Sequence, residues 1–175
     1  MSDRCKQVVA NVLKTLASKE IKPTKILLHK FIYFLSTQGV NVGFRFEPYT
    51  YGPYSFDLSS TIGSMAFWDE VEEKGTTVTA LNLEKYQDAD ANELQQLTEN
   101  LEKFLTVVPP KNFTFDNLEC VGTVLYCAEV LSKHGKEPTT QAVIEEFKAW
   151  KGKKYSEESI KDCYKRLKPY FPTLQ

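Results

Sequence analysis

The stretch Phe44-Arg-Phe-Glu-Pro-Tyr-Thr-Tyr-Gly-Pro-Tyr-Ser-Phe-Asp-Leu58 is crowded with aromatic residues and contains the turn-forming pair Gly52-Pro53. Glycine adopts backbone angles that other residues avoid, and proline suits the first turn of a helix because its φ is fixed. The stretch therefore predicts a short extended segment that turns sharply, at residues 51–54, into a helix. We expect this third helix to run from Tyr54 to about Met65, with Phe56 facing inward.

Two helices are predicted before this turn. Apolar residues recur at helical spacing over residues 3–18. Pro23 opens a second helix, over about residues 23–38, and Gly39 ends it as a C-cap. Apolar residues cover most of the circumference of the second helix, so we expect it to be the most buried one. His29, beside Lys30 on this helix, is interpreted as partly exposed.

A β-hairpin is predicted after the third helix. Residues 67–73 and 76–83 flank Lys74-Gly75, and the second run alternates with the threonine and valine content that is typical of strands. Glycine at the bend supports the hairpin. The order helix, helix, helix, hairpin is that of a winged helix-turn-helix.

Four further helices are expected in the second half of the chain. One covers residues 90–106 and ends before two prolines, which cannot continue a helix. The next runs from Asp116, as its cap, to about Lys133, and the last two start at Thr139 or Thr140 and at Ser156.

These elements predict a mainly α fold with a small β-hairpin (α+β), in which a winged-helix-like N-terminal half packs with C-terminal helices. We expect residues 1–175 to form a single domain, because the C-terminal apolar stripes must be buried somewhere. The alternative is a subdivision into a winged-helix-like part, 1–106, and a C-terminal helical part, 111–175.

Charge is unevenly distributed along the chain. The formal net charge of −1 provides no global field that would attract nucleic acid. Residues 1–40 and 148–168 are nevertheless basic, and residues 69–102 are acidic. We interpret these segments first as solvated faces, with internal pairing or partner docking as the alternatives.

The cysteines and histidines do not form a metal-binding pattern. The cysteines are Cys5, Cys120, Cys127 and Cys163. They form no CxxC pair, and the two histidines stand alone, so we expect no metal site and no cofactor. Reduced thiols, no signal peptide and no apolar run near eighteen residues together predict a cytoplasmic protein with no membrane partner.

Three stretches together resemble a known family. Residues 25–35 with Gly39, residues 46–58, and residues 118–131 followed by residues 153–160 are similar to the YwgA-like proteins, a prokaryotic family without an established activity. Residues 25–58 also resemble, more distantly, the Panacea domain of SocA-type antitoxins and phage-associated proteins. The Panacea likeness implies protein binding, either to neutralise a toxin or to deliver a client to a protease.

Catalytic patterns are weak. Asp57 with Glu72 and Lys74 matches a short D…ExK nuclease pattern that is common by chance. Cys127 and His134 are two helical turns apart, about 10 Å along the axis, which is too far for direct contact. No phosphate loop, nucleophile elbow or HExxH motif is present. We therefore expect no enzymatic activity, and a hydrolase or nuclease with an unrecognised site is the third hypothesis.

Nucleic-acid binding is the second hypothesis. A DNA-reading third helix should carry Arg, Lys, Asn or Gln on its outer face, and residues 54–65 contain none of these. The hairpin that would form the wing is acidic. The basic first and last helices remain as an alternative surface.

The aromatic turn allows two interpretations. Its rings either fill the core, or several tyrosines stay exposed and bind a partner, since tyrosine buries much area at little entropic cost. The leading hypothesis is a non-catalytic protein-interaction module, antitoxin-like or adaptor-like, whose candidate anchors are Arg45, Tyr49, Tyr51 and Tyr54.

Overall fold

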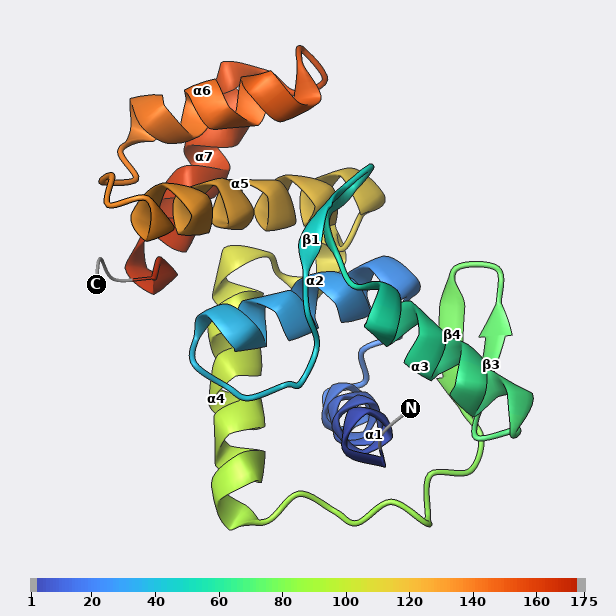
Figure 1. Cartoon of the computed structure of the whole chain (residues 1–175). Helices are drawn as coiled ribbons and strands as arrows, with labels where there is room; N and C mark the ends of the chain where they lie inside the picture. Colours follow the sequence, from blue (N-terminus) through green and yellow to red (C-terminus); the bar gives the residue numbers. More distant parts are fainter. Residues whose placement is uncertain (1–2, 173–175) are drawn as a thin grey trace.

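The computed structural model describes residues 3–172 and consists mainly of α-helices (Figure 1). The first half contains α1 (Asp3–Ser18), α2 (Lys25–Thr37), β1 (Glu47–Tyr49), β2 (Gly52–Tyr54), α3 (Phe56–Phe67), β3 (Val71–Lys74) and β4 (Thr77–Ala80). The second half contains α4 (Ala91–Val107), α5 (Phe115–Lys133), α6 (Thr140–Lys151) and α7 (Glu157–Leu167), with short 3₁₀ turns at Pro110–Asn112 and Lys168–Tyr170. The predicted mainly α fold with a small β component is confirmed.

Helix α2 lies at the centre of the molecule, as its nearly all-round apolar surface predicts. Every residue from Leu27 to Leu35 is buried, and α2 contacts α4, α5 and β2. The rings of Phe31 and Phe34 pack against the ring of Phe104 on α4, with centroids 5.5 and 5.4 Å apart. Aromatic pairs at these separations add to the stabilisation that burial alone provides.

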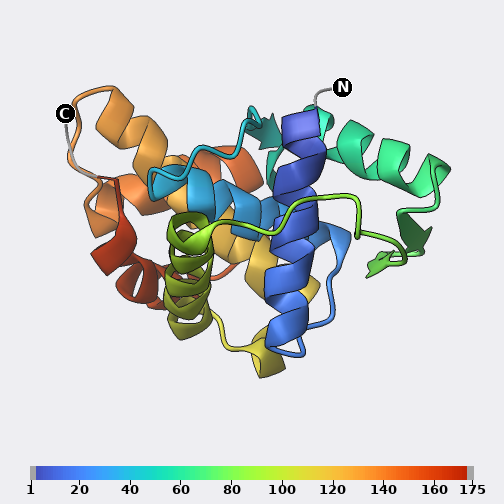
Figure 2. The same ribbon diagram turned by 90° about the horizontal axis from the view of Figure 1, so that it is seen from below.

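Helix α1 packs against α3 and α4. Figure 2 shows residues 81–90 crossing α1 on their way to α4. Lys14 fixes this crossing, because its ammonium group donates to the carbonyl oxygen of Tyr86 at 3.2 Å and pairs with the carboxylate of Asp88 at 2.8 Å. The basic first helix is therefore partly neutralised by the polar connector.

Two antiparallel hairpins are present among the described residues. In the first, Glu47 pairs with Tyr54 and Tyr49 pairs with Gly52. In the second, β3 pairs with β4, which confirms the hairpin predicted around Lys74-Gly75. Its first strand is shorter than predicted, since the segment before Val71 belongs to the end of α3 and a turn.

The prediction for the turn at residues 51–54 is wrong in its local structure. Pro53 does not begin a helix but lies in β2, and Gly52 adopts a φ of +99° that favours glycine. Ser55 is the N-cap of α3, because its side chain accepts a hydrogen bond from the Leu58 amide at 3.1 Å. The helix therefore starts two residues late, and Phe56 faces solvent instead of the core.

The C-terminal helices begin at side-chain caps. Ser156 caps α7, as the sequence predicts, and of the two candidates predicted for α6, Thr139 is the cap. The predicted cap of α5 is wrong: Thr114 accepts from the Asn117 amide at 3.2 Å, and Asp116 lies in the first turn. An acidic side chain there still favours the helix, because it faces the positive end of the helix dipole.

A single hydrophobic cluster runs through both halves of the chain, from Val8 on α1 to Leu167 on α7. Helix α5 is the link, since it packs against α2 and β2 on one side and α6 and α7 on the other. Within residues 3–172, no helix combines the length and apolar character needed to cross a membrane.

Candidate functional site

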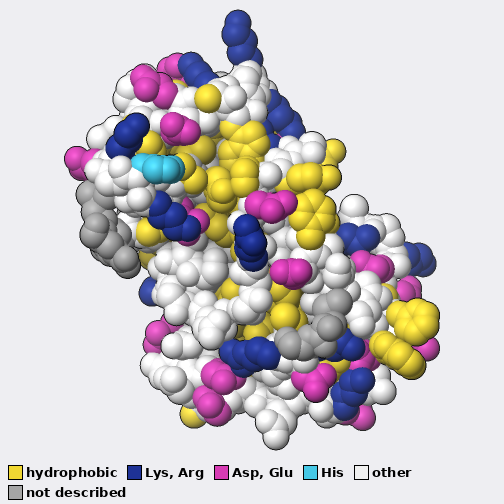
Figure 3. Space-filling view, in the orientation of Figure 1, with side chains coloured by type: hydrophobic (Ala, Val, Ile, Leu, Met, Phe, Trp, Pro, Cys, Tyr) yellow, Lys and Arg dark blue, Asp and Glu magenta, His cyan; other side chains and the backbone are white. Residues whose placement is uncertain are grey.

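Large aromatic side chains are exposed around the β1–β2 hairpin. About half of the surface of each of Tyr49, Tyr51 and Phe56 is exposed, and Phe115 at the start of α5 is 43% exposed. We call these four residues together with the half-buried Tyr54 the aromatic patch. Figure 3 shows hydrophobic side chains gathered where the hairpin meets the C-terminal helices.

The rings of the aromatic patch contact one another in two groups. Tyr54 lies 5.1 Å from Tyr49 and 5.0 Å from Phe56 between ring centroids, and Tyr49 lies 5.2 Å from Phe56. At the hairpin tip, Tyr51 meets Phe115 edge to face at 4.8 Å. Residues from two elements far apart in the sequence therefore build one apolar surface.

The buried side chain of His29 packs against the aromatic patch. Its ring stacks on Tyr54, with centroids 4.3 Å apart and planes 8° from parallel. The Ser55 amide donates to His29 Nδ1 at 3.3 Å, and Nε2 lies 3.3 Å from the Ser59 hydroxyl. Burial lowers the pKa of His29 to about 3, with a further contribution from the charge of Lys30. His29 is therefore a neutral, buried positioning residue, and its predicted partial exposure is wrong.

Lys30 is buried beneath the hairpin. Its ammonium group donates to the carbonyl oxygen of Pro53 at 2.8 Å, and its residue surface is only 3% exposed. Burial lowers the pKa of Lys30 to about 7, opposed by the nearby charge of Glu119 and assisted by that of Lys151. A buried ammonium requires such partners, because desolvating a charge is costly.

Two glycines make room for the Lys30 side chain. A Cβ atom at Gly122 on α5 would lie 2.8 Å from Lys30 Cδ and 3.2 Å from Pro53 Cδ. A Cβ atom at Gly52 would lie 3.2 Å from the Thr123 hydroxyl, at a φ that other residues rarely adopt. The lysine, the hairpin and α5 are thus packed in direct contact.

Glu119 on α5 joins the hairpin to the C-terminal helices. Its carboxylate is fully buried and accepts from Lys151 at 3.2 Å, from Lys154 at 2.5 Å and from the Tyr155 hydroxyl at 2.5 Å. Burial alone would raise the pKa of Glu119, but the hydrogen bonds from Lys154 and Tyr155 and the charge of Lys151 hold it below its usual value.

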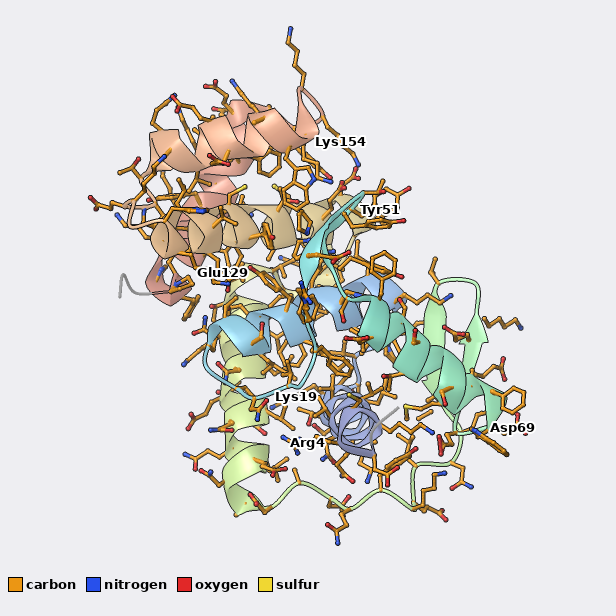
Figure 4. The ribbon with its side chains drawn as sticks, viewed as in Figure 1. Arg4, Lys19, Tyr51, Asp69, Glu129 and Lys154 are labelled. Atoms are coloured by element: carbon orange, nitrogen blue, oxygen red, sulfur yellow. The ribbon has the colours of Figure 1, made fainter. Side chains whose placement is uncertain are left out.

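The two lysines on Glu119 also reach the hairpin tip. Lys151 donates to the carbonyl oxygen of Thr50. The Lys154 ammonium lies 5.6 Å from the centroid of Tyr51 and 5.9 Å from that of Phe115, which places a cation beside the exposed rings (Figure 4). The hairpin is therefore held by the buried Lys30 at Pro53 and by Lys151 at Thr50.

A small apolar cavity opens beside the aromatic patch. Its volume is about 170 Å³, and its lining includes Ile26, His29, Tyr51, Tyr54 and Phe115. Lys30 contributes to the same lining. A cavity of this size suits one protruding apolar side chain of a partner better than a large cofactor.

The predicted anchors are placed as follows. Tyr49 and Tyr51 are exposed and Tyr54 is half-buried, all within the aromatic patch. Arg45 is exposed in the connection that precedes β1. Sequence reasoning missed Phe115, because the predicted helix begins at Asp116 and Phe115 falls in the connection before it.

The residues tested for catalysis lie elsewhere. Asp57, Glu72 and Lys74 are exposed on α3 and β3, and residues 3–172 contain no group of three or more His, Cys, Asp or Glu that could hold a metal ion. Burial raises the pKa of Cys127 to about 12, while His134 is exposed and contacts the Val130 carbonyl oxygen.

A comparison with protein-family models and a comparison with curated protein sequences each found no match to this chain.

Proposed function

We propose that this chain is a non-catalytic protein-interaction module that binds a partner protein through the aromatic patch. The observation that carries the proposal is the exposure of Tyr49, Tyr51, Phe56 and Phe115 around a hairpin whose carbonyl oxygens accept from two lysines. Exposed aromatic side chains dominate binding energies in protein interfaces. Holding them in one position before binding lowers the entropic cost of association.

The chemistry around the rings also favours a protein partner. Tyrosine offers an apolar ring and a hydroxyl group, and Lys154 lies over the rings of Tyr51 and Phe115. Such a surface accommodates an apolar side chain with acidic or polar neighbours. An antitoxin-like or adaptor-like role agrees with the resemblance of residues 25–58 to the Panacea domain. This role, and a location in the cytoplasm, are parts of the same proposal.

A winged-helix arrangement of the first half is also part of the proposal. Helices α1, α2 and α3 precede the β3–β4 hairpin, and a β-bridge joins Thr24, before α2, to Thr77 on β4. Nucleic-acid binding by this half is less favoured. Helix α3 lacks Arg, Lys, Asn and Gln, and β3 exposes Glu72 and Glu73, which would repel phosphates.

The proposal is tested by affinity capture from the native host with three immobilised proteins. They are the wild type, the Tyr49→Ala/Tyr51→Ala variant, and a matched control, Phe67→Ala/Trp68→Ala. The control removes two highly exposed rings at the C-terminal end of α3, outside the aromatic patch. We expect at least one protein to bind the wild type and the control but not the Tyr49→Ala/Tyr51→Ala variant.

The captured protein is then purified and its affinity measured by calorimetry. We expect Tyr51→Ala to weaken binding by about 30-fold, corresponding to about 2 kcal/mol. Circular dichroism should show both double variants folded, since the replaced rings are at least about half exposed. Identical protein sets on all three columns, or capture of nucleic acid alone, would contradict the proposal.

A further inference from the structure

A second cavity, of about 300 Å³, lies between α5 and α7. Its lining is largely polar and includes Asn117, Asp162 and Arg166, but two cysteines also reach it, Cys120 from α5 and Cys163 from α7. The cavity does not share a lining residue with the apolar cavity beside the aromatic patch. It gives small polar molecules access to two thiols that are otherwise buried.

The two thiols lie at the same cavity, on helices that contact each other. Cys120 is 7% exposed and Cys163 is 2% exposed. They come from helices that pack against each other and are separated by more than forty positions in the sequence. Sequence spacing therefore gave no indication of the pair.

The surroundings make the two sulfurs chemically different. A side-chain hydrogen bond with Cys163 lowers the pKa of Cys120, and the charge of Arg166 acts in the same direction against burial and Glu119. The same hydrogen bond, together with burial, raises the pKa of Cys163. A thiolate is the nucleophilic form of cysteine, so Cys120 is the group that reacts first.

We infer that Cys120 and Cys163 form a peroxide-oxidisable thiol pair that closes into a disulfide between α5 and α7. The Cys120 thiolate attacks one oxygen of a hydroperoxide, forming an S–O bond and breaking the O–O bond. The leaving oxygen takes a proton and departs as water or an alcohol. The Cys163 sulfur then attacks the sulfur of the resulting sulfenic acid, and the hydroxyl leaves as water with the proton of Cys163.

Two electrons pass from the thiol pair to the hydroperoxide in this reaction. One hydroperoxide and two thiols give one disulfide, one water and one alcohol, or two waters when the oxidant is hydrogen peroxide. No other reactant is required.

Cys127 provides an internal comparison. It lies on α5 like Cys120 and is also buried, but it is not among the residues that line the cavity. Burial raises its pKa to about 12. A thiol without access and without thiolate character should not react with peroxide under native conditions.

The test treats the folded protein with hydrogen peroxide, blocks remaining thiols with an alkylating agent, and digests the protein without reduction. Mass spectrometry should find a peptide pair joined through Cys120 and Cys163, lighter by two hydrogen atoms than the separate peptides. The pair should persist in Cys127→Ser and disappear in Cys120→Ser. In Cys163→Ser, a dimedone adduct should accumulate at Cys120, since the sulfenic acid has no second thiol to attack it.

Circular dichroism confirms that each variant is folded before oxidation. A linkage through Cys127 instead of Cys163 overturns the inference. So does a wild-type protein that shows no joined pair after treatment, or a Cys163→Ser variant in which Cys120 stays unmodified.

Discussion

Replacing Lys30 by methionine should remove a pH dependence from the stability of this protein. The buried Lys30 ammonium has its pKa lowered from 10.5 to about 7, and burial is the main cause. Between these values the unfolded chain binds one more proton than the folded chain does at this residue. The free energy of unfolding of the wild type should therefore rise with pH across this window. Below about pH 7 the cost of burying the charge is fully present.

The size of this change in the free energy of unfolding follows from the single proton that Lys30 binds. The contribution of Lys30 should change by about 1.4 kcal/mol per pH unit within the window, and by about 5 kcal/mol across all of it. Methionine is close to lysine in length and carries no charge, so it fits the space beside Gly122 without this cost. The Pro53 carbonyl loses its donor in the variant, which costs about 1 kcal/mol at every pH.

Urea unfolding followed by circular dichroism measures this difference. The free energies of wild type and Lys30→Met are compared at intervals from about pH 6 to about pH 10, and the difference between them should shift in favour of the wild type as pH rises. Lys74→Met, at an exposed position on β3, is the matched control for the loss of one lysine. A difference between wild type and Lys30→Met that stays constant from pH 7 to 10 would refute the reasoning.

Three further predictions concern the same region and are measured by urea unfolding. Glu119→Gln should cost about 3 kcal/mol at neutral pH, because two lysines lose a buried partner. The pKa of Glu119 is lowered, so the wild type itself should lose the stabilisation by this carboxylate as pH falls below about 4.5. Equal loss of stability in acid for the wild type and Glu119→Gln would contradict this prediction. Gly122→Ala should lower the free energy of unfolding by about 1 to 3 kcal/mol, because the new methyl group overlaps Lys30. Gly63→Ala, with open space on α3, should raise it by about 0.5 to 1 kcal/mol. Similar effects of the two substitutions would contradict the close packing at Gly122. Ser55→Ala should cost about 1 kcal/mol by removing the cap of α3, and an unchanged midpoint would show that the cap contributes nothing.

The helices of this fold were predictable because each one carries a long apolar stripe. Helix α2 could be assigned to the centre from its sequence, since apolar residues cover nearly all of its circumference. Caps were predictable where one residue was the only candidate, as at Ser156. At α5, Thr114 and Asp116 are both good caps, and only the backbone geometry decides between them.

The β1–β2 hairpin could not be predicted in the same way. Each of its strands has three residues, which is too short to show the alternation that marks a strand. Gly52-Pro53 fits a helix start as well as a hairpin. Lys30 and Lys151 bind the carbonyl oxygens of the hairpin, and both lysines are remote from it in sequence.

The burial of His29 and Lys30 could not be predicted from the sequence. A lysine is rarely buried without a partner, and sequence alone does not show that Pro53 and Glu119 provide one. His29 is buried because Tyr54 stacks on it and Ser55 donates to it. Both residues precede their partners by more than twenty positions, so no local pattern connects them.

The polar network formed by Glu119, Lys151 and Lys30 is placed where it serves recognition more than stability. Replacing a buried ion pair by apolar residues of similar volume often leaves a protein equally stable or makes it more stable. Glu119 and its lysines are therefore not the most stabilising residues for the space between α5, α6 and the hairpin. These residues instead fix the position of the hairpin. Lys151 and Lys30 bind carbonyl oxygens at Thr50 and Pro53, on either side of Tyr51. An apolar contact would allow the hairpin to slide, whereas hydrogen bonds at both positions allow one placement of the Tyr51 ring. We interpret the network as the element that keeps the aromatic patch ready to bind.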